Sequence, residues 1–295
     1  MTSIKPDSHS YLLRGMNKMS AYDRSVSEYY SKAKLEEQIL DALKTTGKNI
    51  DELLVDDLAA LDEFHIRGRK ATEELAQWAR IRADYSLLDV GCGLGGTGRY
   101  LATVFGCNVS GLDLTEEYCR IAAMLSARVG LKSKTFFRQG SALAMPFADR
   151  NFDIVWTEHV QMNIADKTGF YNEISRVLRP GGQFVFHDIF AGNNEELHYP
   201  VPWAADNAVS HLIAVEDLRS ILSALGYIHV QWEDKSSESA VFFRTVLQRL
   251  RGQEWPPVGL HLLMGDDAKT KCENMLGNLQ NNRVRVVQAV MIRGR

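Results

Sequence analysis

The stretch LLDVGCGLGGTGRYLA, from Leu87 to Ala102, constrains the fold of this chain more than any other. A short apolar run that ends in a glycine-rich turn and continues into helix-forming residues predicts a strand, a tight loop and a helix. Such units occur where parallel strands are joined by crossover helices, with the loop at the carboxyl edge of the sheet. The stretch therefore predicts an α/β fold with a binding site next to these glycines.

The rest of the chain supplies further strands for this sheet. Apolar runs at 108–114, 135–139, 152–157 and 183–189 alternate with amphipathic segments at 115–129 and 167–178, and two more runs lie at 228–232 and near the C-terminus. This alternation predicts a doubly wound, seven-stranded, mostly parallel sheet. The last run alternates polar and apolar residues, and we expect it to be an antiparallel edge strand.

The chain outside the sheet divides into three parts. Residues 1–80 lack strand patterns, and apolar residues at helical spacing there indicate a helical N-terminal cap. We expect the cofactor-binding core to span 81–235, and a helical insertion followed by the final edge strand to span 236–295. The polar, proline-marked segment 191–210 is expected to be an irregular loop that contacts the substrate.

Charge and cysteine usage limit the partners. The formal net charge is −3, Lys and Arg are interspersed with Asp and Glu, and no apolar run approaches the roughly 20 residues of a membrane span. We therefore expect a cytoplasmic protein that binds a small molecule and neither nucleic acid nor a membrane, with a homodimer left open. The four cysteines show no metal-ligand spacing, which predicts reduced thiols and no metal site.

A carboxylate, Asp89, stands two residues ahead of the glycines. Gly91, Gly93 and Gly96 fit the G-x-G-x-x-G pattern of nucleoside-binding loops, and Asp113, at the end of the next strand, suits ribose hydroxyls. Asp89 would oppose the pyrophosphate of a dinucleotide by on the order of 1 kcal/mol or more. It suits S-adenosylmethionine, which carries a sulfonium and an ammonium and no phosphate. In the alternative interpretation, Asp89 points away and caps backbone amides.

These residues, together with three later motifs, resemble a known family. The motifs are LLDVGCGLGG, GLDLT, MPFADRNFDIVWTEHV and RVLRPGG, between Ser86 and Asp188. They resemble the class I S-adenosylmethionine-dependent methyltransferases, in particular the small-molecule branch that includes sarcosine/dimethylglycine, phosphoethanolamine, tocopherol, ubiquinone-type and sugar methyltransferases. The resemblance implies a Rossmann-like methyltransferase sheet with a helical cap.

The resemblance also implies which residues contact the cofactor. Gly91 and Gly93 are expected to approach its methionine part, with Asp89 close by, while Asp113 holds the ribose and Leu114 lines the adenine. Ser141 stands where relatives often have an acid for the adenine amino group. The full set of implied cofactor-binding residues is Phe64, His65, Asp89, Gly91, Gly93, Asp113, Leu114, Ser141, Ala142 and His159.

Several relatives have a base in a His-x-x-Asp run after the fourth strand, where this chain has Asn163-Ile164-Ala165-Asp166. Asparagine can orient a substrate but cannot take its proton. Asp188, at the carboxyl end of the fifth strand, is the preferred candidate base, with the histidines His65, His159 and His187 as alternatives. The catalytic candidates are thus Asp188, His159 and Asn163, and the substrate candidates are Tyr30, Gln161, Asn163 and Trp203.

The sequence therefore predicts methyl transfer from S-adenosylmethionine to a small molecule. A nitrogen acceptor such as glycine, sarcosine or dimethylglycine is slightly favoured, because amines need no strong base and aromatic side chains attract methylated ammonium groups. A phenol, quinol or sugar, methylated on oxygen or carbon, is the first alternative. An NAD(P)-dependent oxidoreductase, a catalytically inactive cofactor-binding protein and a nucleic-acid methyltransferase are the alternatives of other classes.

Overall fold

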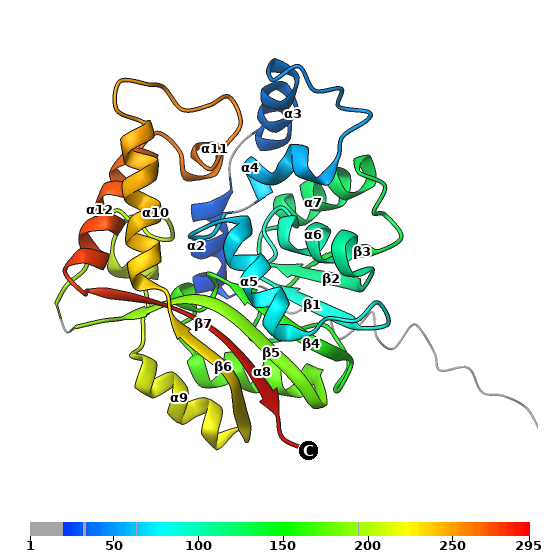
Figure 1. Cartoon of the computed structure of the whole chain (residues 1–295). Helices are drawn as coiled ribbons and strands as arrows, with labels where there is room; N and C mark the ends of the chain where they lie inside the picture. The colour runs from blue at the N-terminus through cyan, green and yellow to red at the C-terminus, as the bar shows by residue number, and fades with distance from the viewer. Residues whose placement is uncertain (1–19, 32–33, 63, 194) are drawn as a thin grey trace, which may run out of the picture.

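The computed structural model describes residues 20–31, 34–62, 64–193 and 195–295, and one seven-stranded sheet crosses the molecule (Figure 1). The strands are β1 (Ser86–Val90), β2 (Asn108–Asp113), β3 (Thr135–Gln139), β4 (Phe152–Glu158), β5 (Leu178–Ala191), β6 (Tyr227–Asp234) and β7 (Val284–Arg293). Their order is β3-β2-β1-β4-β5-β7-β6, and the first five are parallel to one another. The predicted doubly wound, seven-stranded, mostly parallel sheet is confirmed.

The final strand is antiparallel, as expected, but it is not an edge strand. β7 lies between β5 and β6 and pairs antiparallel with both, so β6 forms the edge. The residues from Val286 to Val290 are all buried, whereas Ile228 and Val230 of β6 are 66% and 49% exposed. A strand with neighbours on both sides and helices on both faces is buried at its polar positions as well as its apolar ones. The weak polar–apolar alternation of β7 therefore did not mean that one side of the strand faces solvent.

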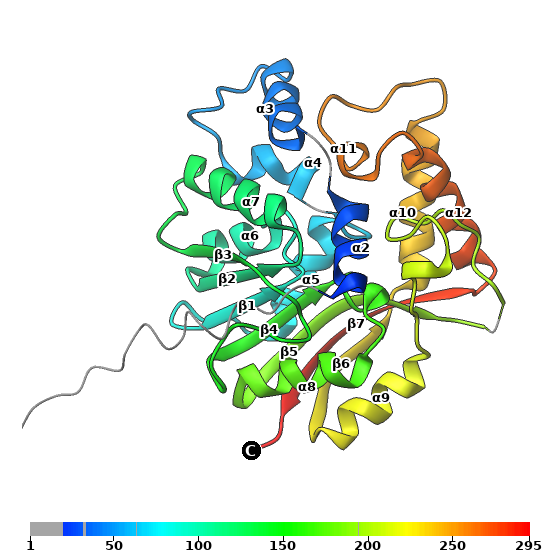
Figure 2. The ribbon, with the colours of Figure 1, turned by 180° about the vertical axis from the view of Figure 1, so that it is seen from behind.

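Helices cover both faces of the sheet. On one face, α5 (Arg69–Ala79) and α6 (Gly96–Phe105) share a hydrophobic cluster with β1, β2 and β4. On the other, α8 (Lys167–Val177) and α9 (Val215–Ala224) share a second cluster with the same sheet. α7 (Glu116–Arg128) packs beside β2 and β3. Figures 1 and 2 show these two layers from opposite sides.

Two further groups of helices stand above the carboxyl edge of the sheet. The N-terminal group is α2 (Ala21–Tyr30), α3 (Leu35–Thr45) and α4 (Ala59–Asp62); residues 1–19, 32–33 and 63 of the predicted cap lie outside the described residues. The C-terminal group is α10 (Ser236–Arg249), α11 (His261–Met264) and α12 (Ala268–Gln280), and α11 contacts α3. The division into cap, core and insertion remains a prediction.

The sheet reverses its order between β1 and β4, because the chain adds β2 and β3 on one side of β1 and β4 on the other. Ligands bind at the carboxyl edge of such a switch point. In the described part of the chain, no helix is long and apolar enough to cross a membrane.

Candidate active site

A cavity of about 850 Å³ opens at this switch point, between the sheet and the two helix groups. Thirteen of the fifteen residues predicted to form the site lie on its wall. They are Tyr30, Phe64, His65, Asp89, Gly91, Gly93, Asp113, Leu114, Ser141, Ala142, His159, Asn163 and Trp203. Segments from the N-terminal helices to the loop after β5 thus meet at one place.

The glycine loop has the shape that a nucleoside cradle requires. Gly91 and Gly93 have φ of +71° and +52°, a region that L side chains rarely adopt. A Cβ added at Gly91 would lie 2.4 Å from Val160 Cγ2, so Gly91 allows the loop after β4 to approach. A Cβ added at Gly93 would meet no described atom within 4 Å, because this glycine borders open space in the cavity.

The strand-end acid Asp113 is tied to the glycine loop. Its Oδ2 accepts a hydrogen bond from the Gly93 backbone N–H at 2.9 Å, and its Oδ1 accepts one from the Thr115 N–H at 2.8 Å. Burial raises the pKa of this carboxyl. Asp113 therefore fixes the position of Gly93 while presenting its carboxylate to the cavity.

Asp89 lies on the cavity wall with its side chain buried, and the residue is 3% exposed. Its Oδ2 has no hydrogen-bond partner among the described residues. Burial, followed by the charges of Glu158 and Asp113, raises its pKa well above the ordinary value, while the charge of Arg99 and a hydrogen bond with the Gly98 backbone act in the opposite direction. The carboxyl group is thus incompletely satisfied at the edge of an open cavity.

Sequence reasoning missed a third acid, Glu158, which ends β4 on the same wall. Its side chain is 5% exposed, accepts hydrogen bonds from Thr72 Oγ1 at 3.0 Å and Thr97 Oγ1 at 2.5 Å, and pairs with His65 Nε2 at 3.6 Å. The signal that identified Asp113, an acid at the carboxyl end of a predicted strand, applies equally to Glu158. Three neighbouring strands therefore each place an acid on the cavity wall, at or next to the strand's carboxyl end.

Three imidazoles lie together beside Glu158. Ring centroids are 4.9 Å apart for His159 and His187, 6.0 Å for His65 and His187, and 6.3 Å for His65 and His159. Burial and the neighbouring rings lower the pKa of His159 and His187 well below the ordinary histidine value, so both are neutral at pH 7. His159 lines the cavity with φ of +56°, and its Nε2 is buried with no partner in the described part of the chain.

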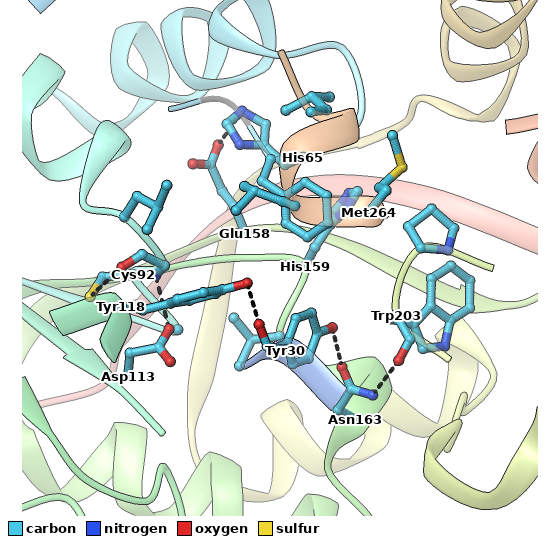
Figure 3. Close-up of a pocket in the computed structure, with 18 of the residues that line it drawn as sticks. Tyr30, His65, Cys92, Asp113, Tyr118, Glu158, His159, Asn163, Trp203 and Met264 are labelled. Atoms are coloured by element: carbon cyan, nitrogen blue, oxygen red, sulfur yellow. Dashed lines mark hydrogen bonds and ion pairs between the residues drawn. The ribbon is translucent and has the colours of Figure 1, made fainter. Parts of the chain in front are cut away.

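Asn163 connects segments that are far apart in the sequence (Figure 3). Its Oδ1 accepts a hydrogen bond from Tyr30 Oη at 2.9 Å, and its Nδ2 donates to the carbonyls of Trp203 at 3.1 Å and Val209 at 2.8 Å. Its own carbonyl accepts from Tyr22 Oη at 2.6 Å. The side chain therefore holds α2 and the 191–210 loop in place, rather than offering a free amide to a substrate.

Two predicted site residues, Asp188 and Gln161, lie outside the cavity wall. Asp188 is 2% exposed, and its carboxylate accepts from the N–H groups of Val160, Gln161 and Ile189 at 2.9–3.2 Å. Gln161 is 1% exposed and donates its amide to the Ile189 carbonyl. The structure therefore does not bring these two residues together with the other thirteen: Asp188 is engaged with backbone N–H groups, and Gln161 is engaged with a backbone carbonyl.

Lys167 complements Asp188 from the other side of the same loop. Its Nζ donates to the carbonyls of Gln161 and Ile164, the latter at 2.6 Å. Burial lowers the pKa of Lys167 to about 8, and burial raises that of Asp188 to about 6. A buried acid and a buried amine thus hold the N–H and C=O groups of the loop that carries His159 and Asn163.

Asp188→Asn is expected to remove a pH dependence of stability. The unfolded pKa of aspartate is about 3.9, whereas the folded pKa is raised to about 6, so the fold favours the protonated form. The free energy of unfolding should therefore fall by roughly 3 kcal/mol through this group as the pH rises from about 4 to 6, and level off above. Urea unfolding of both proteins between pH 4 and 7.5 measures the difference.

Asp188→Asn also tells whether Asp188 holds the backbone of the loop or acts as a general base. Loss of a general base costs about 10²–10⁴ in rate, and such a loss without any change in the pH slope of stability would restore Asp188 as the base.

Comparison with known proteins agrees with this geometry. Residues 88–186 match the family described as "Methyltransferase domain". The chain is 30% identical over 169 residues to "Methyltransferase GfsG" of Streptomyces halstedii, covering 57% of this chain and 59% of that protein. It is 28% identical over 193 residues to glycine/sarcosine/dimethylglycine N-methyltransferase of Actinopolyspora halophila, covering 65% of this chain and 34% of that protein.

A solved structure shows the same fold over nearly the whole chain. It is geranyl diphosphate C-methyltransferase from Streptomyces coelicolor A3(2), in complex with Mg²⁺, geranyl-S-thiolodiphosphate and S-adenosyl-L-homocysteine, with a TM-score of 0.69 and 16% identity. The match covers 94% of this chain and 99% of that one. Other relatives are named for O-methylation of tocopherol and C-methylation of sterols, so the family leaves the acceptor open.

The sheet order, the glycine loop and the matching family together define a class of protein. Residues 88–186 of this chain are a methyltransferase domain of the class I S-adenosylmethionine-dependent type, which confirms the resemblance. The chain spans about a third to three fifths of the length of the two named relatives.

Proposed function

We propose that the protein transfers a methyl group from S-adenosylmethionine to a small-molecule acceptor, with nitrogen favoured as the accepting atom. The observation that carries the proposal is the buried carboxyl group of Asp89, which lies on the wall of the cavity that Gly93 also lines and lacks a partner at Oδ2 among the described residues. Of the described residues on the cavity wall, six are acidic and two, Arg69 and Arg249, are arginines. A wall of this charge favours a cationic nucleoside over an anionic one.

The residues present fit the cofactor. Gly93 leaves the space that a nucleoside needs, Asp113 presents a carboxylate for ribose hydroxyls, and Asp89 offers an acceptor for a positively charged group. Leu114, Ser141 and Ala142 would flank the adenine, and Phe64, His65 and His159 would complete the site. Bound there, S-adenosylmethionine supplies a methyl group already activated on a sulfonium. The protein's task is then to align the acceptor and exclude water.

The choice of nitrogen follows from the bases that the cavity offers. Asn163 cannot take a proton, Asp188 does not face the cavity, and Glu158 is engaged with two threonines and His65. His159 has a free Nε2 among the described residues, but its lowered pKa makes it a weak base. An amine that reaches the site uncharged needs no base before it reacts, whereas a phenol or sugar hydroxyl does.

The alternatives predict different ligands. A dinucleotide would bring a pyrophosphate to the acids beside the glycine loop, which is unfavourable. An inactive cofactor-binding protein would bind S-adenosylhomocysteine without turnover, and a nucleic-acid methyltransferase would need a basic surface that a net charge of −3 does not supply.

A binding and transfer assay tests the proposal. S-adenosylhomocysteine is expected to bind in calorimetry and NADH is not, and labelled S-adenosylmethionine should transfer label to amines in preference to phenols, quinols and sugars. Binding of NADH alone would overturn the class of reaction. Transfer to hydroxyl acceptors alone would overturn the choice of nitrogen.

His159→Asn tells the two kinds of acceptor apart. With an amine, kcat should change less than tenfold, whereas a hydroxyl acceptor that relies on this imidazole should lose about 10²–10⁴.

A further inference from the structure

A group of apolar side chains lines the cavity on the side away from the glycine loop. Figure 3 shows Asp113 and Cys92 on one side of the cavity and Trp203 and Met264 on the other. We name this second side the acceptor chamber and define it by six lining residues: Trp203, Phe242, Phe243, Val246, Leu263 and Met264. Four of them, Trp203, Phe243, Leu263 and Met264, are at most 7% exposed.

Helix α10 builds one wall of the chamber by regular spacing. At about 100° per residue, Phe242, Phe243 and Val246 fall within one apolar stripe of the helix. Val241 lies on the other face and is 54% exposed. The chamber is therefore a directed apolar face, continuous with the hydrophobic cluster that joins α10 and α12 to the sheet.

A small zwitterion such as glycine does not suit this chamber. Its carboxylate needs a cation or several donors once removed from water. Of the two arginines on the described wall, Arg69 pairs with Asp56 at 3.3 Å and stacks on Tyr100 at 4.5 Å, and Arg249 is an exposed residue at the end of α10. None of the six chamber residues is charged, so a glycine carboxylate placed among them would lose its hydration without replacement.

The volume of the cavity also favours an acceptor larger than glycine. Drug-sized ligands occupy cavities of about 300–1,000 Å³, and this cavity of about 850 Å³ has to hold a nucleoside cofactor and an acceptor together. A glycine-sized acceptor would leave much of the apolar wall exposed to trapped water. A hydrocarbon body would displace that water and gain about 0.8 kcal/mol for each CH₂ buried.

We propose that the acceptor is a hydrophobic amine, whose hydrocarbon body occupies the acceptor chamber while its nitrogen faces the glycine-loop side. The proposal rests on the proposed function for the position of the cofactor and goes beyond it by naming the acceptor class. The six chamber residues are uncharged and suit the hydrocarbon tail, while the nitrogen faces the side of the cavity where the cofactor is proposed to bind.

A homologous series of ligands tests the proposal. Straight-chain amines from ethylamine to decylamine are titrated by calorimetry into the wild-type protein saturated with S-adenosylhomocysteine, with glycine and sarcosine as comparison ligands. Affinity is expected to rise by up to about fourfold per CH₂ until the chamber is filled. A flat series, or tighter binding of glycine or sarcosine than of the long amines, would overturn the hydrophobic-amine assignment.

Two matched variants locate the binding. Val246→Trp fills the chamber and should end the rise at a shorter chain, whereas Val241→Trp makes the same change on the exposed face of the same helix and should leave the series unchanged. Met264→Trp, from α11, provides a second filled chamber if Val246→Trp does not fold. An unchanged series in a folded filled variant would overturn the location.

The affinity for S-adenosylhomocysteine keeps the two proposals apart. Unchanged affinity in all variants, with no chain-length effect, contradicts the chamber and leaves the proposed function standing. If the wild type does not bind S-adenosylhomocysteine, the proposed function fails, and the same amine series without it still measures the chamber.

Discussion

Arg99→Met is expected to lower the free energy of unfolding by about 3–5 kcal/mol, because it leaves a buried charge without its partner. The side chains of Arg99 and Asp62 are both 0% exposed, and the guanidinium donates to both carboxylate oxygens, through Nε at 3.2 Å to Oδ2. Burial raises the pKa of Asp62 even though Arg99 lowers it. Desolvation therefore outweighs the attraction, and the pair is stable only while both partners are present.

The pair joins α4 of the N-terminal helices to α6, the helix that follows the glycine loop. A Cβ added at Gly96 would lie 2.4 Å from the backbone oxygen of Asp62, so the two segments are in close contact there. Loss of the pair should loosen the entrance of the cavity as well as the fold. Urea unfolding measures the first effect and affinity for S-adenosylhomocysteine the second.

Two controls make this prediction specific. The double variant Asp62→Leu, Arg99→Met removes both charges and should recover most of the lost stability. Arg82→Met removes an arginine from an exposed pair with Asp84, whose side chains are 65% and 67% exposed, and should leave the melting temperature unchanged. Equal losses in the single and double variants would contradict the argument from an unpaired charge.

The sheet was predictable because its signals are local. Buried strands such as β1 and β4 are continuous apolar runs, and glycine and proline mark where the segments between them stop. The place of β7 was not predictable in this way, since its neighbours β5 and β6 are chosen by long-range packing. A weakly alternating pattern fits an edge strand and a covered antiparallel strand equally well.

The site was predictable where a residue's position fixes its role. Asp113 and Gly93 follow directly from the strand and loop that carry them. Asp188 lies at the correct edge of the sheet, but successive side chains of a strand point to opposite faces. The chain after β4 then brings two backbone N–H groups, those of Val160 and Gln161, to that carboxylate, a contact between segments 27 and 28 residues apart that no local pattern contains.

Asn163 shows the same limit more strongly. Its partners Tyr30, Trp203 and Val209 lie 133, 40 and 46 residues away in the sequence. The family resemblance implies that several relatives have a histidine where this chain has Asn163, but only the fold shows that the amide joins α2 to the loop after β5. A histidine there could not supply one acceptor and two donors in the same arrangement.

Asp89→Asn is expected to change stability and cofactor affinity in opposite directions. The carboxyl group is buried, lacks a described partner at Oδ2 and lies near Glu158 and Asp113, so its ionised form is costly in the ligand-free protein. The neutral amide should therefore raise the melting temperature of the free protein at pH 7.5. A charged hydrogen bond contributes about 1.5–3 kcal/mol, so affinity for S-adenosylmethionine should fall by roughly 10- to 100-fold.

The pH dependence of stability and of S-adenosylmethionine affinity tests whether Asp89 acts as a negative charge. Because the folded pKa of Asp89 is raised, its contribution makes the free protein less stable as the pH rises from the ordinary aspartate value through the folded pKa. A cationic ligand binds the ionised form, so wild-type affinity for S-adenosylmethionine should increase with pH over the same range. Both slopes should be smaller in Asp89→Asn.

Asp153→Asn is the matched control, since Asp153 is another acid beside β1 but at the opposite end of the sheet. It accepts the Ser86 N–H at 2.8 Å and pairs with Arg179, so its loss should cost stability and leave cofactor affinity unchanged. If Asp89→Asn behaved in that way too, Asp89 would be a structural cap. The opposite behaviour of the two variants would instead mean that a negative charge stands before the glycines because the ligand they hold is positive.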